Sequence, residues 1–314
     1  MSRIRDLSRN ILCNAKYVSL NSDKAQSFAH ACEDAEITIP TWDYEGFYPK
    51  ADDFEEICLF YLVFNAINYC YFDREGNKFS DNGLRGSSLM TTRLAQRWEE
   101  IRDPYFLSNL DENYVLSELL PAENPIFLVR ERVAALQEVG KFLNSNPDFT
   151  FDKYFRRFKK NAYYASQALP TFFPLWRDPF FKRSQLFVGM VYGRFQNWAD
   201  LPISADSLQD LTVFADYRIP QTLSSVGIIS YAPELAEDLK NGKFVDSGSR
   251  KELEIRAASV LAADLITENL KKIVDDDINS LHTDYILWSA GHHKEDFPVG
   301  TWQEQHHFCI TTDY

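Results

Sequence analysis

Residues 249–273 read SRKELEIRAASVLAADLITENLKKI, a run long enough for about seven turns of α-helix. Ser249 and Glu252 stand in the register of a capping box, in which two side chains satisfy backbone N–H groups at the start of a helix. Ala257, Leu261 and Leu265 follow at helical spacing. This segment predicts a long α-helix and decides the expected fold class, which is mostly α.

Other segments support a helical fold. Residues 51–72, ADDFEEICLFYLVFNAINYCYF, place one apolar stripe at steps of three and four from Phe54 to Tyr71, with Asn68 in its middle. A buried amide must find hydrogen-bond partners, so Asn68 is either a structural bridge or a ligand contact. Residues 278–291 and 230–239 also predict helices, the second ending near Gly242. Only LTVF at 211–214 and HHFCITTDY at 306–314 read as strands.

The composition predicts a large packed interior. Apolar residues make up 45% of the 314 residues and aromatic residues 15%, whereas 12 Gly and 13 Pro are few for a protein rich in tight turns. We expect one domain over residues 1–314, with lobes 1–148 and 149–314 that share a core. The SNPDF stretch at 145–149 marks the expected boundary between the lobes.

The formal net charge of −13 argues against a nucleic-acid polymer or an anionic membrane as partner, because both carry dense negative charge. A small anionic ligand remains open, since local Lys and Arg residues decide its binding. No window of about 18 apolar residues predicts a membrane span. The five cysteines are scattered without a CxxC pair and the N terminus lacks a signal-peptide pattern, which together predict a cytoplasmic protein.

Two charged clusters have a functional and a structural interpretation. The basic run from Lys153 to Lys160 alternates with aromatic residues, as in a nucleic-acid strand site, but it also fits an amphipathic helix with a solvated basic face. The pairs His292–His293 and His306–His307 lack metal-ligand spacing, because neighbouring residues on a strand point to opposite sides. We expect no metal. GxGxxG and Walker motifs do not occur, so no nucleotide cofactor is expected. The GxSxG motif of a serine nucleophile does not occur either.

The stretch LTVFADYRIPQTL at 211–223 places Asp216 where a buried apolar run ends. Charged groups avoid apolar surroundings unless they are paired or in use. Asp216 and Lys182, each beside aromatic residues, would suit cleavage of a glycosidic bond, because a fixed carboxylate stabilises the cationic transition state of the sugar. An ion pair between Asp216 and an Arg or Lys that joins two helices is the alternative.

Several motifs, in this order along the chain, resemble the queuosine salvage family of queuosine 5′-phosphate N-glycosylases/hydrolases. They are FFKRSQLFVG at 180–189, LTVFADYRIPQTL at 211–223, LEIRAASV at 253–260, LHTDYILW at 281–288 and HHFCITTDY at 306–314. RDLSRNI at 5–11 and the region from YPKADD to FNAINYCYF at 48–72 extend the likeness over nearly the whole chain. The chain departs from the family pattern at Asn65, where members often carry Asp, and at Tyr48, where they carry His.

The resemblance implies a two-lobed helical bundle akin to helical DNA glycosylases, and hydrolysis of queuosine 5′-monophosphate to free queuine. It implies Asp216 and Lys182 as the catalytic pair. Trp288, Tyr285 and Tyr69 would stack on the base, Asp284 or Glu254 would bind its ammonium, and Arg218, Arg183, Lys50 or His307 would bind the phosphate. The expected substrate contacts are Asn68, Tyr69, Arg183, Tyr217, Arg218, Gln221, Glu254, Arg256, Asp284, Tyr285, Trp288 and His307.

Two rival functions remain at this point. One is a helical DNA-base glycosylase, which would need a basic groove that the acidic balance does not favour. The other is a non-catalytic protein that binds queuine or a nucleotide, with Asp216 in a structural ion pair. We expect a monomer whose only partner is the small nucleotide.

Overall fold

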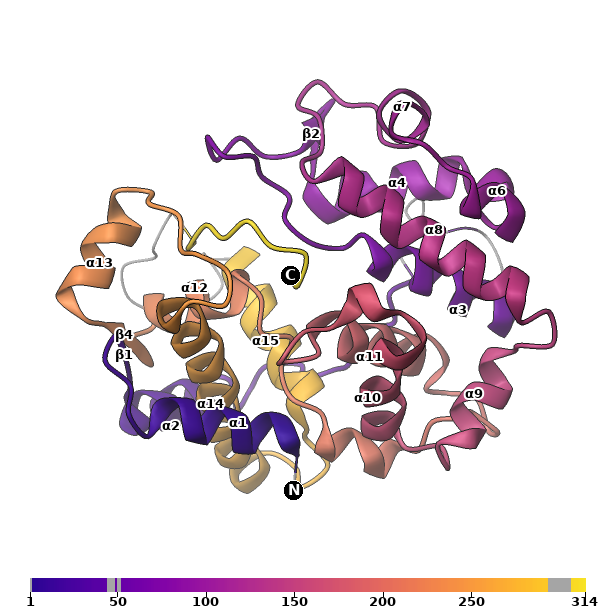
Figure 1. Ribbon diagram of the computed structural model, residues 1–314. Helices are drawn as coiled ribbons and strands as arrows, with labels where there is room; N and C mark the ends of the chain where they lie inside the picture. Colours follow the sequence, from indigo (N-terminus) through magenta and orange to yellow (C-terminus); the bar gives the residue numbers. More distant parts are fainter. Residues whose placement is uncertain (1, 44–48, 50–51, 293–305) are drawn as a thin grey trace. The chain divides into compact units, whose positions relative to one another are not determined.

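The computed structural model describes residues 2–43, 49, 52–292 and 306–314, and these form two compact units. Unit 1 comprises Met1–Pro40 and Ala205–Ile310, and unit 2 comprises Thr41–Ser204 and Thr311–Tyr314. Each unit therefore joins stretches that lie far apart in the sequence (Figure 1).

Unit 1 is built around one long helix, α14 (Arg250–Ile273) (Figure 1). The helices α1 (Arg3–Leu12), α2 (Ser22–Ala31), α12 (Arg218–Ser225) and α15 (Ser280–His292) pack against it. The α14 helix begins as the capping pattern predicts, because the Ser249 hydroxyl accepts the backbone N–H of Glu252 at 3.3 Å. The elements of unit 1 are α1 (Arg3–Leu12), β1 (Val18–Leu20), α2 (Ser22–Ala31), the 3₁₀ helix η3 (Ala205–Asp210), α12 (Arg218–Ser225), β4 (Ile229–Tyr231), α13 (Pro233–Lys240), α14 (Arg250–Ile273) and α15 (Ser280–His292). β1 and β4 pair antiparallel, with Ser19 opposite Ser230.

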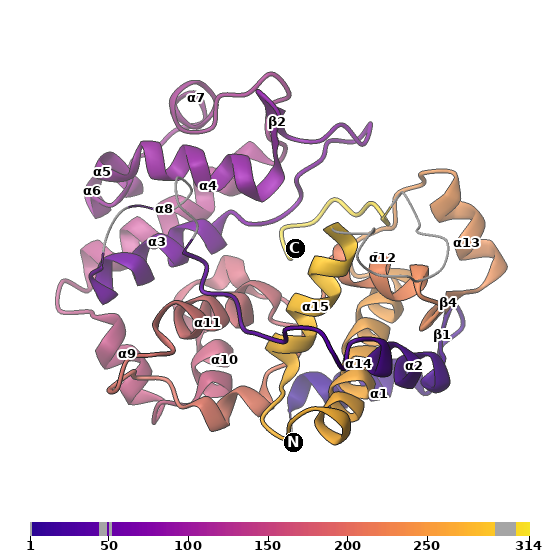
Figure 2. The same cartoon turned by 180° about the vertical axis from the view of Figure 1, so that it is seen from behind.

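Unit 2 is also helical, with one two-stranded antiparallel sheet formed by β2 (Ser80–Asp81) and β3 (Leu84–Arg85). Its helices are α3 (Phe54–Ala66), α4 (Gly86–Gln96), α5 (Trp98–Ile101), α6 (Pro104–Ser108), α7 (Glu112–Tyr114), the π-helix η1 (Val115–Leu119), α8 (Val129–Ser145), α9 (Phe151–Arg157), α10 (Ala162–Phe172), the 3₁₀ helix η2 (Pro174–Trp176) and α11 (Lys182–Phe195). Figure 2 shows them from the opposite side.

The helices α3 and α11 of unit 2 pack on each other and run antiparallel, as the contacts at their two ends show. At one end the rings of Phe54 and Phe195 lie 5.1 Å apart. At the other end the guanidinium of Arg183 donates to the carbonyl of Ala66 at 2.9 Å. Gly140 lets α8 approach α6, since a Cβ there would lie 2.4 Å from the backbone nitrogen of Ser108. Lys182 is the first residue of α11, so the contacts between α3 and α11 hold the helix that carries Lys182.

The mostly α fold class is confirmed, as are helices at 249–273 and 278–291. The strand predictions are wrong. Residues 211–214 form no strand, and 306–314 contribute only an isolated bridge between Phe308 and Phe244. The helix expected over 51–72 ends at Ala66, and the segment expected to be helical from Ser230 begins as strand β4. No helix in the described part of the chain has the length and apolar character needed to cross a membrane.

The two units do not divide near residue 148. The rings of Phe142 on α8 and Phe149 lie 5.1 Å apart, and Phe149 lies 5.2 Å from Phe151 on α9. The SNPDF stretch is therefore an exposed turn inside unit 2, and its half-buried Phe149 packs on both flanking helices. The likeness to DNA glycosylases and the single domain over 1–314 stay predictions.

Candidate active site

The residues expected at the active site fall into both units, and each group is described within its own unit. Asp216 and most expected substrate contacts belong to unit 1, whereas Lys182, Arg183, Asn68 and Tyr69 belong to unit 2. The proximity of Asp216 and Lys182 stays a prediction.

In unit 1 the buried segment 211–215 leads to Asp216, and Arg5 on α1 holds the start of this segment. The guanidinium of Arg5 donates to the carbonyls of Asp210 at 3.1 Å and Leu211 at 2.7 Å. It also donates at 3.0 Å to both carboxylate oxygens of Asp264 on α14. One side chain thereby ties α1, α14 and the beginning of this segment together.

The middle of the segment is held by two residues that were expected to contact substrate. The Asp284 carboxylate accepts the N–H of Phe214 at 2.8 Å, and Nε of Arg256 donates to the carbonyl of Ala215 at 2.9 Å. These side chains take the place of a neighbouring strand, because they satisfy buried backbone groups that would otherwise lack partners. Asp284 and Arg256 therefore fix the backbone immediately before Asp216.

Asp216 itself caps helix α12. Its Oδ1 accepts the backbone N–H groups of Arg218 at 2.7 Å and Ile219 at 3.2 Å. The side chain is half-buried, and among the described residues of unit 1 it forms no ion pair and no hydrogen bond through Oδ2. Within unit 1 the structural ion pair considered above is thus absent. One oxygen of the carboxylate is fixed by the backbone and the other has no partner there.

Three further expected residues lie around the start of α12. Nη1 of Arg218 donates to the side-chain oxygen of Gln221 at 3.0 Å, and its guanidinium lies 5.8 Å from the ring centroid of Tyr217. The rings of Tyr217 and His306 lie 4.3 Å apart. A half-buried cation and two aromatic rings are thus gathered beside the Asp216 cap.

Behind this segment, His307 and Arg256 are buried together in unit 1. Burial, and secondarily the positive charge of Arg256, lower the pKa of His307 to about 3. The imidazole is therefore neutral at pH 7. Nη1 of Arg256 lies 3.6 Å from a carboxylate oxygen of Glu252, one turn earlier on α14, so the buried guanidinium has a counter-charge.

Tyr285 and Trp288 form a parallel aromatic pair on α15. Their ring centroids are 6.1 Å apart with an interplanar angle of 15°. Trp288 is 39% exposed and Tyr285 is half-buried. The pair offers a flat surface of the kind on which a planar base stacks.

Glu254 has a different environment from the other expected residues. Its carboxylate accepts the backbone N–H groups of Lys16, Tyr17 and Val18 at 2.6–3.2 Å and the guanidinium Nε of Arg250 at 2.8 Å. These hydrogen bonds fix the loop before β1. The arrangement favours a structural role, and we leave Glu254 out of the proposed substrate contacts.

In unit 2 Lys182 is the first residue of α11 and is only 4% exposed. Its Nζ donates to the carbonyl of Asn68 at 3.4 Å. Its backbone N–H donates to a carboxylate oxygen of Asp178 at 2.8 Å. The residue before it, Phe181, has left-handed backbone angles, with φ of 53° and ψ of 33°. Both the amine and the backbone of Lys182 are therefore held in place.

Arg183 and Tyr69 form a buried stack in unit 2. The guanidinium of Arg183 lies 5.1 Å from the ring centroid of Tyr69 and 5.4 Å from that of Trp176, and it donates to the carbonyls of Ala66 and Leu175. Burial lowers the pKa of Arg183 and raises that of Tyr69. Because Arg183 is 2% exposed and bonded to main-chain carbonyls, its environment favours a role in packing over phosphate binding.

The turn after α3 carries Asn68 and depends on a residue that sequence reasoning missed. Asn68 donates to Asn65 at 3.3 Å and accepts the Tyr71 hydroxyl at 2.8 Å, so its amide acts as a structural bridge. Arg132 on α8 is fully buried and donates to the carbonyls of Ile67, Tyr69, Cys70 and Phe127. The apolar periodicity of α8 gives no sign that one of its arginines points inward.

Comparison with known proteins gives the same family throughout. The family model described as queuosine salvage protein matches residues 47–311. A queuosine 5′-phosphate N-glycosylase/hydrolase of Dictyostelium discoideum is 32% identical over 319 residues, covering 93% of this chain and 94% of the relative. The chain belongs to the queuosine salvage family. A relative of the same name from Sphaerobacter thermophilus is 27% identical over 94% of this chain and 93% of its own length, and one from Bos taurus is 32% identical over 55% of each.

Membership of the queuosine salvage family confirms the resemblance read from the motifs. The matched range contains Lys182, Asp216 and every expected substrate contact, whereas Arg5 lies before it. Lys50, expected as a phosphate ligand, lies outside the described residues, as does His293. Within the described residues no group of three or more His, Cys, Asp and Glu side chains is placed to hold a metal ion.

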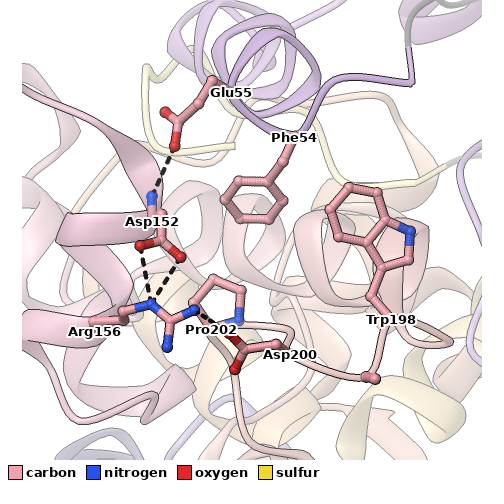
Figure 3. A pocket seen from close by; sticks show the side chains of 8 residues that line it. Phe54, Glu55, Asp152, Arg156, Trp198, Asp200 and Pro202 are labelled. Carbon is pink, nitrogen blue, oxygen red and sulfur yellow. Dashed lines mark hydrogen bonds and ion pairs between the residues drawn. The ribbon is translucent and has the colours of Figure 1, made fainter.

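A separate cavity of about 600 Å³ lies in unit 2, and none of its lining residues is an expected catalytic residue or substrate contact. Figure 3 shows Phe54 and Trp198 as its aromatic walls, with Asp152, Arg156 and Asp200 beside them. Arg156 pairs with Asp152 at 2.8 Å and with Asp200 at 2.7 Å. Hydrogen bonds from Arg156 and Lys160 lower the pKa of Asp200 to about 2. These charges bind one another, and we assign no ligand to this cavity. The ion pairs fit the solvated basic face that was the alternative to nucleic-acid binding for the 153–160 run.

Proposed function

We propose that this protein hydrolyses the N-glycosidic bond of queuosine 5′-monophosphate and releases free queuine. Its relatives over nearly the full chain are named queuosine 5′-phosphate N-glycosylase/hydrolase. The observation that carries the proposal is the carboxylate of Asp216. Two backbone N–H groups fix its Oδ1, and Oδ2 has no partner among the described residues of unit 1.

In this proposal Oδ2 of Asp216 lies below C1′ of the ribose, where positive charge develops as the bond to the base breaks. Queuine is a 7-deazaguanine, so carbon replaces the ring nitrogen that an ordinary purine can protonate on leaving. The enzyme must therefore rely on stabilising the sugar cation, which a preorganised carboxylate does by its charge. Asp216 then either forms a glycosyl intermediate or directs water onto C1′.

Lys182 is the second catalytic residue in the proposal. Its ammonium would keep Asp216 ionised or contact the hydroxyls of the sugar, because a nearby positive charge favours the charged form of a carboxylate. Its burial and its contact with the Asn68 carbonyl support a fixed position for the amine.

The remaining contacts follow from chemistry and exposure. The Tyr285–Trp288 pair would stack on the base, and Arg218 would pair with the phosphate. Asp284 and Arg256 would act by holding the backbone before Asp216. The five free cysteines support a protein of the cytoplasm, and the acidic charge supports action on a small nucleotide and not on a polymer. The monomeric state stays a proposal.

The test is mass-spectrometric detection of free queuine after incubation with queuosine 5′-monophosphate. We expect Asp216→Asn to lower the rate about 10²- to 10³-fold, since the charge is lost. Its stability should stay close to that of the parent, because Asn also caps helices well. Asp216→Ala removes the cap too and should be about 1 kcal/mol less stable than Asp216→Asn.

Other outcomes decide between the rivals. An Asp216→Asn rate within tenfold of the parent would remove Asp216 from catalysis. Recovery of intact nucleotide from a tight complex would identify a binding protein, and base release from a damaged DNA duplex would identify a DNA glycosylase.

A further inference from the structure

The sequence contains the same short pattern twice, and neither copy is explained by the proposed reaction. Residues 102–106 read RDPYF and residues 177–181 read RDPFF. In each copy the Asp carboxylate accepts the backbone N–H of the residue two positions later, at 2.8 Å for Asp103 and 3.0 Å for Asp178. Both copies lie in unit 2.

The two copies then diverge. Asp103 is exposed and caps α6 directly, with Pro104 as its first helical residue. Asp178 is only 6% exposed, and its second oxygen accepts the backbone N–H of Lys182 at 2.8 Å. The chain therefore makes an extra turn before helix α11, and the helix begins at Lys182.

The extra turn requires an unfavourable backbone conformation. Phe181 has φ of 53°, a region that residues other than glycine adopt at a cost of order 1 kcal/mol or more. Hydrogen bonds on both sides offset this cost. The backbone N–H of Phe181 donates to the carbonyl of Asp178 at 3.1 Å, and the buried Gln185 side chain donates to the carbonyl of Phe180 at 3.0 Å.

We propose that Asp178 is a positioning residue that sets the start of α11 and so holds the amine of Lys182 against the carbonyl of Asn68. The consequence for catalysis rests on the proposed function, whereas the effect on the lysine does not. An error of about 1 Å in the position of a catalytic group can cost about 10²-fold in rate.

The first experiment measures the lysine without any substrate. Asp178→Asn and its matched control Asp103→Asn are labelled with a small amine reagent, and the rate at Lys182 is read by peptide mass spectrometry. Loss of a buried hydrogen bond makes local opening easier, so we expect labelling to rise about 5- to 100-fold in Asp178→Asn only. Equal rates in the parent and Asp178→Asn would overturn the proposal. Should Asp178→Asn not fold, Asp178→Ser, which keeps one acceptor, replaces it.

The second experiment is a double-mutant cycle with Lys182→Met, read as the rate of queuine release. In the parent background Asp178→Asn should lower kcat about 10-fold or more with KM within about threefold. In the Lys182→Met background the same change should lower kcat by less than about twofold, because Asp178 acts through the amine. An equal loss in both backgrounds would show a merely structural role and overturn the proposal.

The two experiments separate the two proposals. Increased labelling in Asp178→Asn supports the positioning role even if the parent releases no queuine, and that failure counts against the proposed function alone. Increased labelling with unchanged kcat would support the positioning of the amine and overturn its consequence for catalysis.

Discussion

His307 is a buried imidazole next to a buried guanidinium, and this makes it sensitive to acid. Its pKa is about 3 in the folded protein and near the ordinary 6.5 in an unfolded chain. Between these values the unfolded chain takes up a proton that the folded protein does not, so acid favours unfolding. The effect is absent above about pH 7.

We therefore expect His307→Gln to reduce the loss of stability on acidification. At pH 5 the difference in proton binding should account for about 2 kcal/mol of the loss in the parent. Urea unfolding at pH 7 and pH 5 measures it, with the exposed His30→Gln on α2 as the control. An identical pH dependence in His307→Gln and the parent would contradict the burial of a neutral imidazole.

At the scale of single residues, the sequence indicated which charged residues matter but not which groups they contact. Asp216 stood out because it follows a buried apolar run, whereas Arg256 and Asp284 were indicated by the family resemblance, and all three are engaged around one segment. Their partners are backbone groups brought close by the fold. No spacing within the sequence predicts such partners, because Arg256 and Ala215 are 41 residues apart.

At the scale of elements, the turn that follows α3 depends on one side chain from α8. Arg132 donates hydrogen bonds to the carbonyls of Ile67 and Tyr69, which would accept backbone N–H groups if α3 were longer. The helix therefore ends at Ala66, although its apolar stripe continues to Tyr71. A periodic pattern reports which residues become buried, and it does so whether or not the backbone stays helical.

We expect Arg132→Met to destabilise the protein by about 3 kcal/mol or more, because it leaves buried carbonyls without donors. Arg130→Met on the same helix removes only an ion pair with Glu112 from a side chain that is 83% exposed, and should change stability by less than about 0.5 kcal/mol. Denaturant unfolding compares the two. Equal effects would show that the Arg132 contacts contribute nothing specific.

The absence of the strand predicted at 211–214 has a similar physical reason. LTVF at 211–214 has the apolar character of a buried strand, but Arg5, Asp284 and Arg256 satisfy the backbone around it, so it needs no neighbouring strand. The long helices were predictable because capping and periodicity are local. The contacts between α1, α14 and this segment were not predictable, because they join residues that lie far apart in the sequence.

At the scale of the molecule, each unit is discontinuous in sequence, and the last four residues belong to unit 2. Tyr314 is 1% exposed, and its carbonyl accepts the N–H of Cys70 at 2.9 Å. The polar stretch at 145–149 could not reveal this division, because the chain passes between the units after Pro40, Ser204 and Ile310.

Tyr314→Ala should therefore lower the stability of unit 2 by about 3 kcal/mol, the usual cost of removing a buried aromatic ring. Hydrogen exchange read by mass spectrometry should show faster exchange in α3 and α8 than in the parent, with a smaller change in α14. Thr312→Ala, at a half-buried position in the same tail, serves as the control. Equal exchange in α3 and α8 of Tyr314→Ala and the parent would contradict a role for the tail in unit 2.

The ion pair between Arg5 and Asp264 spans 259 residues of chain, and this has a consequence for biosynthesis. A ribosome adding about 5–20 residues per second reaches Asp264 roughly 10–50 s after it has added Arg5. During that interval the nascent α1 has no α14 to pack against, and the stretch 41–204 is completed before α14 is made. Folding chaperones would thus meet an amphipathic helix α1, with Ile4 uncovered, that cannot dock until residue 264 has been made.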